Sequence, residues 1–323
     1  MTSVPVVTIS GASGQIAYDI AFAVAAGALL GRRTPLRLRL LSTPRSTSRV
    51  EGLALELEDT IFPMLHSVDV FDDATAAFDG TDIAFLVASG KLTPGTNRLG
   101  FLESAVPIAA EHGAALNAGA ADDIRAVVVS NPVNTTVGLM SAAARDIPRS
   151  RFSGLSRLDH NRAVAAFSRH YRVPTEDVTR MAVWGNHSDT QYADASNVRV
   201  AGTPVVHDAA WTDEAFATEV ARRGHVVRDL RGPSVASAAL SAVGHMRDWV
   251  GGTPADDWAS AAVFSDGSYG IPEGLVSSFP VTSTGGDWEI VQGLSLTDEA
   301  TTQIGLSVDE LQHEWKLAGG IGR

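Results

Sequence analysis

The 323-residue chain contains no cysteine. This absence excludes a disulfide framework, a thiolate metal site and a thiol-based redox switch. Long hydrophobic runs are also missing, because Ala21–Leu30 is too short to span a membrane and is followed by Gly31-Arg32-Arg33. The sequence has no low-complexity tract and no repeat of fixed period, which is typical of a globular protein.

Positive charge is scarce, with 25 Lys and Arg against 37 Asp and Glu, a net charge of −12. This balance argues against nucleic acid or an anionic membrane as the main partner. The first residues enter a strand pattern directly, without the features of a signal or transit peptide, so we expect a cytoplasmic protein. No His, Asp and Glu residues have the spacing of metal ligands, so no metal is predicted. A cytoplasmic enzyme or binding protein remains.

The N-terminal segment has the order strand, glycine turn, helix. Val4–Ser10 is apolar and rich in β-branched residues, as in a buried parallel strand, and a helical pattern covers Ile20–Leu30. In the turn between them, Gly11 permits a tight bend and Gly14 allows the backbone to approach a pyrophosphate. The turn reads Gly11-Ala12-Ser13-Gly14-Gln15-Ile16-Ala17. By itself this spacing fits an ordinary βα turn equally well, but its place after the first strand favours dinucleotide binding.

The next predicted strand, Leu36–Leu41, is followed by a polar loop without an acidic residue before Val50. A site specific for NAD usually has an acid here that binds the ribose hydroxyls. The loop instead offers donors suited to a 2′-phosphate, although a solvated polar loop is the alternative. These donors are Ser42, Thr43, Arg45, Ser46, Ser48 and Arg49. We therefore predict a preference for NADP(H), with NAD(H) as a second cofactor.

Further βα units follow, with a helix predicted over Val50–Leu65 and strands over Ala84–Ala88 and Ala126–Asn131. Repeated units of this kind predict an α/β domain with a doubly wound parallel sheet over residues 1–152, with ligands at the carboxyl ends of its strands. Asn131 ends one strand, and its amide could bind a nicotinamide or a substrate oxygen. The alternative is a turn-forming Asn-Pro pair.

The second half changes character, and residues 153–323 are predicted to form a mixed α/β substrate domain. A long helix comes first, followed by strands, a polar hairpin and several helices. The expected elements are a strand at Val178–Trp184, a hairpin at Val198–Pro204, helices at Phe216–Leu230, Ser234–Val250 and Thr297–Leu317, and strands at Ala261–Ser265, Ser277–Val281 and Trp288–Val291.

Two short stretches carry the residues suited to chemistry, Ser156–Ala163 and Trp184–Ser188. Asp159 and Arg162 are three positions apart, so on a helix they share one face. A carboxylate beside a histidine suits a proton carrier, and an arginine suits a substrate carboxylate. The alternative is a local ion pair at a helix N-terminus with a structural histidine.

Together with the glycine turn, a series of motifs in a fixed order gives the chain a resemblance to malate dehydrogenases of the lactate/malate dehydrogenase family. The similarity is strongest to the branch with cytosolic and NADP-type members, whose doubly wound domain is a Rossmann fold. The motifs are Glu51-Gly52, Glu56-Leu57-Glu58-Asp59, Asn131-Pro132-Val133-Asn134, Arg157-Leu158-Asp159-His160-Asn161-Arg162, Trp184-Gly185-Asn186-His187-Ser188, Arg247-Asp248-Trp249 and Tyr269-Gly270-Ile271-Pro272-Glu273-Gly274.

The resemblance implies roles for individual residues. His187 would exchange a proton with the substrate oxygen, with Asp159 as its partner. Arg162 would bind the C1 carboxylate, Arg98 would polarise the C2 carbonyl, and Asn131 would hold nicotinamide or the reacting oxygen. The implied cofactor-binding residues are Gly11, Gly14, Gln15, Ile16, Ser42, Thr43, Arg45, Ser46, Val129 and Asn131.

The loop before Arg98 departs from the family pattern, because Leu92 takes the place of the arginine that binds the distal carboxylate of oxaloacetate. Ala105 and Val235 likewise replace an asparagine and a serine. Three substrates follow as alternatives. Short donors of the loop could bind a tetrahedral anion, as in phosphonopyruvate; Lys91 could substitute for the arginine, with oxaloacetate as substrate; or Leu92 could enlarge an apolar pocket. The donors are Ser89, Lys91, Thr93 and Thr96.

We therefore expect an NADP(H)-dependent 2-oxo acid reductase, most consistent with phosphonopyruvate, with Lys91, Leu92 and Thr93 among its substrate-binding residues. An ordinary malate dehydrogenase and a catalytically silent nucleotide-binding relative are the alternatives. The eight histidines other than His187, His160 among them, are interpreted as packing or surface residues, with cofactor contact by His112 as a minor alternative. The resemblance also implies a homodimer.

Overall fold

The computed structural model describes residues 4–90, 98–205 and 211–320. Contacts within the chain divide it into two compact units, which are described separately. Unit 1 comprises Met1–Ser153, Val235–Arg247 and Leu317–Arg323, and unit 2 comprises Gly154–Ser234 and Asp248–Lys316. The first division falls between Ser153 and Gly154, and two later segments belong to unit 1. No helix in the described part of the chain is long and apolar enough to cross a membrane.

Unit 1 is built on a parallel sheet with the strand order β3-β2-β1-β4-β5. The first strand is wholly buried between β2 and β4, and its Val7 pairs with Leu38 on one side and Ile83 on the other. An apolar run of β-branched residues suits such a doubly covered position. The strands are β1 (Val6–Ser10), β2 (Leu36–Leu41), β3 (Leu65–Phe71), β4 (Ile83–Leu86) and β5 (Arg125–Val128), with β6 (Phe152–Gly154) following β5 in the order.

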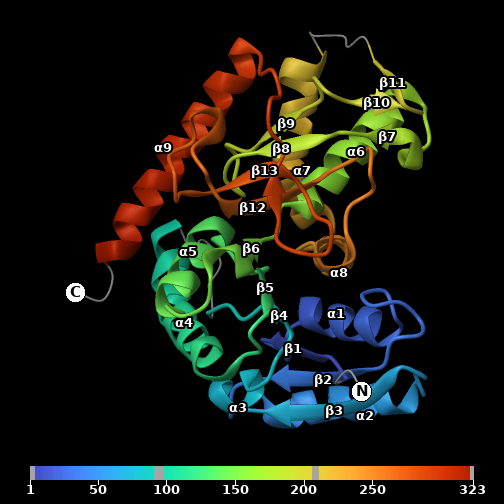
Figure 1. Cartoon of the computed structure of the whole chain (residues 1–323), viewed down its shortest axis with the longest axis vertical. Coiled ribbons are helices and arrows are strands. Elements are labelled where there is room, and N and C mark those ends of the chain that lie inside the picture. The colour runs from blue at the N-terminus through green and yellow to red at the C-terminus, as the bar shows by residue number, and fades with distance from the viewer. Residues whose placement is uncertain (1–3, 91–97, 206–210, 321–323) are drawn as a thin grey trace. The chain divides into compact units, whose positions relative to one another are not determined.

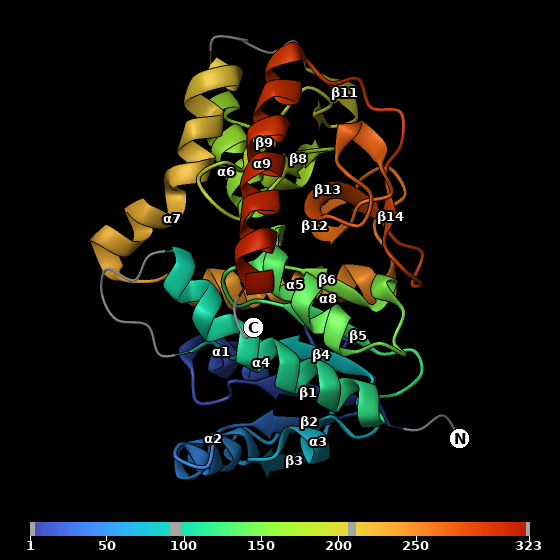
Figure 2. The same ribbon diagram turned by 90° about the vertical axis from the view of Figure 1, so that its left-hand side faces the viewer.

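The helices of the first 153 residues fall into two groups, one of α1 with α2 and one of α3, α4 and α5, as their mutual contacts show (Figure 1). Helix α1 buries Ala17, Ile20 and Val24 on one side, as expected for a helix that packs on a sheet. Figure 2 shows α4 and α5 on the side that faces the viewer. The bounds are α1 (Gln15–Ala25), α2 (Thr47–Asp59), α3 (Ala74–Phe78), α4 (Arg98–Gly119) and α5 (Val133–Ala143).

The predicted helix over Val50–Leu65 is wrong at its C-terminal end. Helix α2 ends at Asp59, Ile61 has a positive φ of 52°, and Leu65 already begins β3. Pro63 explains the early end, because proline removes a backbone donor and disfavours helical geometry in the residue before it. The strand that follows, LHSVDVF, has polar residues between its apolar ones and is only partly buried, so it lacks the continuous apolar run of a buried strand.

Unit 2 combines antiparallel strands with long helices. Strand β12 pairs with β13 and β13 with β14, β8 pairs with β9, and β10 lies between β7 and β11. The strands are β7 (Val178–Thr179), β8 (Ala182–Trp184), β9 (Tyr192–Asp194), β10 (Arg199–Val200), β11 (Thr203–Pro204), β12 (Ala259–Phe264), β13 (Val276–Thr282) and β14 (Glu289–Ile290). The expected strand Val178–Trp184 is interrupted, since Arg180 has a φ of 61° and separates β7 from β8.

The helices beyond residue 153 are α6 (Arg157–Tyr171), α7 (Ala217–Arg231), α8 (Ala236–Gly251) and α9 (Asp298–Gly320). Short helical segments occur at Arg149–Arg151, Thr175–Asp177, Ser268–Gly270 and, as a π-helix, Trp211–Phe216. One core cluster of unit 2 joins Trp184 of β8 with Phe279 of β13 and Ile304 of α9. Val183, the residue between Ala182 and Trp184 in the same strand, belongs to a second cluster with Phe167 and Phe216. The strand that precedes the Gly185–Ser188 motif is therefore fixed by packing in two clusters.

Candidate active site

The turn after β1 has the geometry that dinucleotide binding requires. Gly11 has a φ of +65°, and a Cβ added there would lie 2.8 Å from the Cα of Ala88, so only glycine fits. The Ser10 hydroxyl accepts the N–H groups of Val87 and Ala88 at 3.1 and 3.2 Å, which joins the carboxyl ends of β1 and β4. Gly14 then immediately precedes α1, so the free N–H groups of that helix begin at this turn.

The polar loop after β2 lies directly before α2. The buried Ser42 donates its backbone N–H to the carbonyl of Phe71, which ties the loop to the end of β3. The hydroxyls of Thr43 and Ser46 are 2.9 Å apart, and the side chain of Arg45 is exposed. The loop thus keeps a compact turn while one guanidinium extends into solvent.

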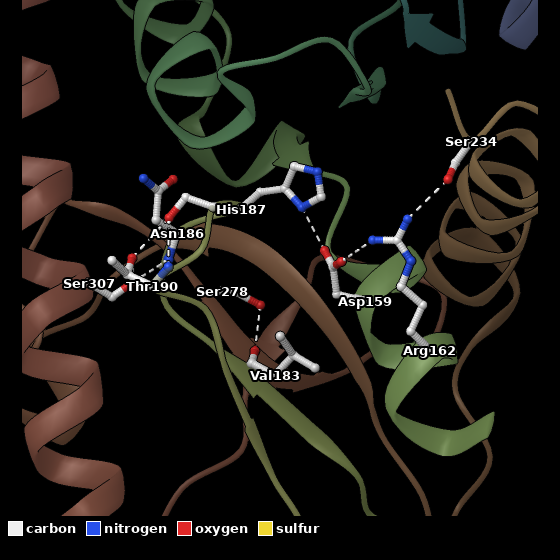
Figure 3. A network of polar contacts seen from close by, with 10 residues as sticks. Asp159, Arg162, Val183, Asn186, His187, Thr190, Ser234, Ser278 and Ser307 are labelled. Carbon is white, nitrogen blue, oxygen red and sulfur yellow. Dashed lines mark hydrogen bonds and ion pairs between the residues drawn. The ribbon is translucent and has the colours of Figure 1, made fainter. Parts of the chain in front are cut away.

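Unit 2 brings Asp159, Arg162 and His187 into direct contact (Figure 3). The Asp159 carboxylate lies at the centre, with Oδ2 2.6 Å from His187 Nδ1 and Oδ1 2.8 Å from Arg162 Nη1. Arg162 Nη2 also donates to Ser234 Oγ at 3.2 Å. One carboxylate oxygen therefore binds the guanidinium of Arg162 and the other binds the imidazole of His187, and the carboxylate orients both side chains.

Burial distinguishes the three side chains. That of Asp159 is 1% exposed, that of Arg162 12% and that of His187 21%. Burial alone would raise the pKa of Asp159, but the charge and hydrogen bond of His187 and those of Arg162 together hold the pKa below its ordinary value. The buried carboxylate thus stays ionised, and it orients two side chains that are more exposed than itself. This arrangement is expected where Arg162 and His187, but not Asp159, contact a ligand.

The segment that carries His187 follows β8 and turns sharply. Gly185 has a φ of +90° and pairs with Ser278 of β13 through two backbone hydrogen bonds, 3.2 and 2.8 Å long. The hydroxyl of Ser278 donates to the carbonyl of Val183 at 2.6 Å. These contacts fix the chain immediately before the histidine. Among the described residues no three His, Asp or Glu side chains are grouped to hold a metal ion.

Two family profiles cover nearly the whole chain. The lactate/malate dehydrogenase NAD binding domain matches residues 6–154, and the lactate/malate dehydrogenase alpha/beta C-terminal domain matches residues 156–319. The chain belongs to the lactate/malate dehydrogenase family. It is therefore an oxidoreductase that acts on a CH–OH group, with a Rossmann-like nicotinamide-cofactor-binding domain and a C-terminal α/β domain. The predicted fold class is confirmed.

Individual relatives agree with the family assignment. A malate dehydrogenase of Rhodococcus jostii is 47% identical over 98% of this chain and 97% of its own length. A malate dehydrogenase structure from Naegleria fowleri is 36% identical with a TM-score of 0.95, covering 99% of both chains. A lactate dehydrogenase of Trichomonas vaginalis, solved with NADH and oxamate, is 31% identical with a TM-score of 0.92, covering 98% of both.

The predicted site residues of this lactate/malate dehydrogenase fall into three groups. Asp159, Arg162 and His187 lie together in unit 2. In unit 1, Gly11, Gly14, Gln15 and Ile16 line the turn into α1, Ser42, Thr43, Arg45 and Ser46 form the loop after β2, Val129 is half-buried beyond β5, and Asn131 is exposed before α5. Lys91, Leu92 and Thr93 lie outside the described residues, as does the side chain of Arg98 at the first position of α4.

Two histidines have the packing roles that the sequence indicated. His160 is buried and has its Nδ1 3.0 Å from the hydroxyl of Ser260, and burial lowers its pKa to about 3. His112 is buried against the edge of Phe78, and burial lowers its pKa to about 4. Both are therefore neutral near pH 7.

Two residues were not predicted. Ser234, which contacts Arg162, is distant in sequence, and no local pattern distinguishes its hydroxyl from those of other serines. The second residue is Gly224 of α7, which lies close to Arg162. A Cβ on Gly224 would lie 3.6 Å from Nη1 of Arg162, so the helix backbone passes next to the guanidinium.

Proposed function

We propose that the chain reduces a 2-oxo acid to a 2-hydroxy acid with NADP(H), using His187, Asp159 and Arg162. The observation that carries this proposal is the Asp159 carboxylate, which holds an imidazole with one oxygen and a guanidinium with the other. An imidazole next to an ionised carboxylate suits proton exchange near neutral pH, and a guanidinium suits a planar carboxylate.

The residues of unit 1 fit a dinucleotide. Gly11 has no side chain at its close approach to Ala88, and the helix N-terminus after Gly14 suits phosphate oxygens. The bound dinucleotide supplies the hydride that is transferred to C2 of the acid. Residues Gly11, Gly14, Gln15 and Ile16 would hold its pyrophosphate, and Val129 and Asn131 its nicotinamide end.

The protein's own groups then manage charge and the proton. Arg162 would fix the C1 carboxylate, Arg98 would polarise the C2 carbonyl, and His187 would deliver a proton to the C2 oxygen. With Nδ1 facing Asp159, the proton would pass through Nε2. Asp159 keeps a proton on Nδ1 of the His187 ring, so that Nε2 is the nitrogen that exchanges a proton with the substrate, and it favours the protonated ring before the transfer.

The preference for NADP(H) rests on the loop after β2. No acidic residue occurs between Leu41 and Val50, and Arg45 extends into solvent where a 2′-phosphate could reach it. Against this stands the NADH bound in the Trichomonas vaginalis relative. The test compares kcat/KM for NADPH and NADH under identical conditions, and a ratio at or below one contradicts the preference.

The distal group of the substrate depends on Leu92, which resemblance places where an arginine binds oxaloacetate. A charge-assisted hydrogen bond contributes about 1.5–3 kcal/mol, so its loss would lower activity on oxaloacetate by about ten- to a hundredfold. Ser89, Lys91 and Thr93 offer short donors for a tetrahedral anion, which supports phosphonopyruvate. Oxaloacetate is the second candidate, because the 47% identical relative is named a malate dehydrogenase.

The decisive experiment follows NADPH absorbance with phosphonopyruvate, sulfopyruvate, oxaloacetate, pyruvate and 4-methyl-2-oxopentanoate. Preference for a tetrahedral anion supports the proposal. Preference for oxaloacetate means that Lys91 or a neighbour replaces the arginine, and preference for the last two means an apolar pocket around Leu92. A chain that oxidises NADPH with none of them is a nucleotide-binding relative without this activity.

The assembly and the location stay predictions. The family resemblance supports a homodimer. The small-residue stretches Ala21–Ala28 and Ser234–Ala242 suit close helix packing at a subunit interface or within a single chain. The sequence pattern at the N-terminus supports a cytoplasmic enzyme. Light scattering at micromolar concentration tests the first, and a monomer mass contradicts it. Fractionation of cells that produce the protein tests the second.

A further inference from the structure

The residues around His187 alternate in direction. The imidazole of His187 points toward Asp159, whereas Asn186 and Thr190 lie on the opposite side, next to Ser307 of α9 (Figure 3). Ser188 also turns to α9, since its hydroxyl donates to Glu310. The segment 186–190 belongs to no strand or helix, so these side chains connect it to a regular element, α9.

One oxygen of Glu310 collects three of these contacts. Its Oε2 accepts from Ser188 Oγ at 2.5 Å, from Thr190 Oγ1 at 2.6 Å and from Asn186 Nδ2 at 3.0 Å. The donors precede and follow His187 in the chain. An ionised carboxylate only accepts hydrogen bonds, and bonds to it are stronger than those between neutral groups.

The remaining contacts show which groups donate and which accept in the hydrogen-bond network between residues 186–190 and α9. The backbone N–H of Asn186 donates to Ser307 Oγ at 2.7 Å, and Ser307 lies 2.9 Å from Thr190 Oγ1. Because Thr190 donates to Glu310, Ser307 must donate to Thr190. The donor chain thus runs from the backbone beside His187 to Glu310. Glu314 adds a second anchor, accepting from Asn186 Nδ2 at 2.8 Å.

We propose that Glu310 is a positioning residue for His187, which it holds against Asp159 through Asn186, Ser188 and Thr190. It does not touch the substrate, and its role rests on the proposed function of His187. Loss of the carboxylate removes the acceptor that Ser188 and Thr190 share and leaves their hydroxyls to contact each other and Ser307. The segment can then shift, while the fold around Gly185 is kept by its own backbone pairing with β13. A shift of about 1 Å in a reacting group can lower a rate about a hundredfold.

The test compares Glu310→Ala, Glu310→Gln and, as the matched control, Asp309→Ala, whose exposed carboxylate is on the same helix. Glu310→Ala should lower kcat by about ten- to a hundredfold, with the Kd for NADPH unchanged and a larger solvent isotope effect, because proton transfer becomes slower. Glu310→Gln keeps one acceptor oxygen and should lose less than the alanine variant. Asp309→Ala should behave as the unaltered protein.

A second readout does not depend on turnover. In protein labelled with 15N-histidine, the ring signals of His187 are identified by their absence from His187→Asn. Glu310→Ala should shift the Nδ1 signal, and Asp309→Ala should leave it in place. If Glu310→Ala does not fold, Glu310→Gln and Ser307→Ala provide the same comparison.

Unchanged His187 signals and a kcat equal to that of Asp309→Ala would overturn the proposal. If the unaltered protein reduces no 2-oxo acid, the proposed function fails, whereas the ring signals still decide whether Glu310 positions His187. A loss of thermal stability without a change in these signals would indicate a structural role only.

Discussion

Replacement of Asp159 by asparagine tests the core of the site, because it keeps the shape and removes the charge. The two oxygens of Asp159 both accept, one from His187 Nδ1 and the other from Arg162 Nη1. An asparagine offers one oxygen and one NH2 group at these positions. If its NH2 faces Arg162, two donors meet. If it faces His187, Nδ1 becomes the acceptor and the proton is fixed on Nε2, which is the wrong tautomer for proton exchange.

The size of the effect follows from the same contacts. Each hydrogen bond to a charged group contributes about 1.5–3 kcal/mol, and one of the two is lost in either orientation. That range corresponds to about ten- to a hundredfold in rate, before the tautomer is considered. In serine proteases, the same substitution beside the catalytic histidine lowers kcat by roughly 10⁴. We expect kcat/KM of Asp159→Asn to fall by about 10²- to 10⁴-fold.

The assay follows NADPH oxidation at saturating 2-oxo acid, and a fluorescence titration measures the Kd for NADPH in the same variant. The Kd should stay within about twofold, because Asp159 belongs to unit 2 whereas the turn and loop proposed to hold the dinucleotide belong to unit 1. A variant with more than a tenth of the original kcat/KM would refute the reasoning, since the carboxylate would then not set the state of His187.

Three further predictions follow from other contacts. Arg162→Lys should raise KM for the 2-oxo acid about ten- to a hundredfold with a smaller effect on NADPH affinity, because lysine lacks the two-pronged donor; steady-state kinetics measure both. Gly11→Ala should weaken NADPH binding and lower the melting temperature, because its Cβ would lie 2.8 Å from the backbone of Ala88; an unchanged titration and melting curve would contradict this. The lowered pKa of His112, about 4, means that the unfolded chain binds a proton which the folded chain does not, so stability falls as pH drops from about 6.5 to 4. The pKa of His160 is lowered as well, to about 3, so both histidines contribute to this fall. Denaturant unfolding should show that His112→Leu lowers the slope of stability against pH by up to about 1.4 kcal/mol per pH unit and leaves the contribution of His160 in place.

The sequence predicted the order of elements well where periodicity and local context agree. Strand β2 has the predicted bounds Leu36–Leu41, and α9 differs from the prediction by a few residues at its ends. The errors occur where one residue overrides the pattern. Pro63 ends the helix that hydrophobic spacing alone extended to Leu65, and the positive φ of Arg180 divides a strand that its neighbours favoured.

The site was predictable to the extent that its residues are close in sequence. Asp159 and Arg162 share a helix face because of their spacing, but the pairing of Asp159 with His187 needed the resemblance to the family. Glu310 could not be found in this way, because it lies more than a hundred residues from Ser188 and helix α9 shows only its amphipathic spacing. Such contacts depend on tertiary packing, which no local pattern encodes.

The most direct test of the account is the proton step at His187. The measurement is a single turnover of bound NADPH with the best 2-oxo acid of the substrate panel, comparing the unaltered chain with His187→Asn. The account predicts that the variant binds NADPH with unchanged affinity and loses at least about 10²-fold in the rate of NADPH oxidation, because general acid catalysis contributes about 10²–10⁴. Oxidation by His187→Asn within tenfold of the original rate would contradict the role of His187 and, with it, the proposed mechanism.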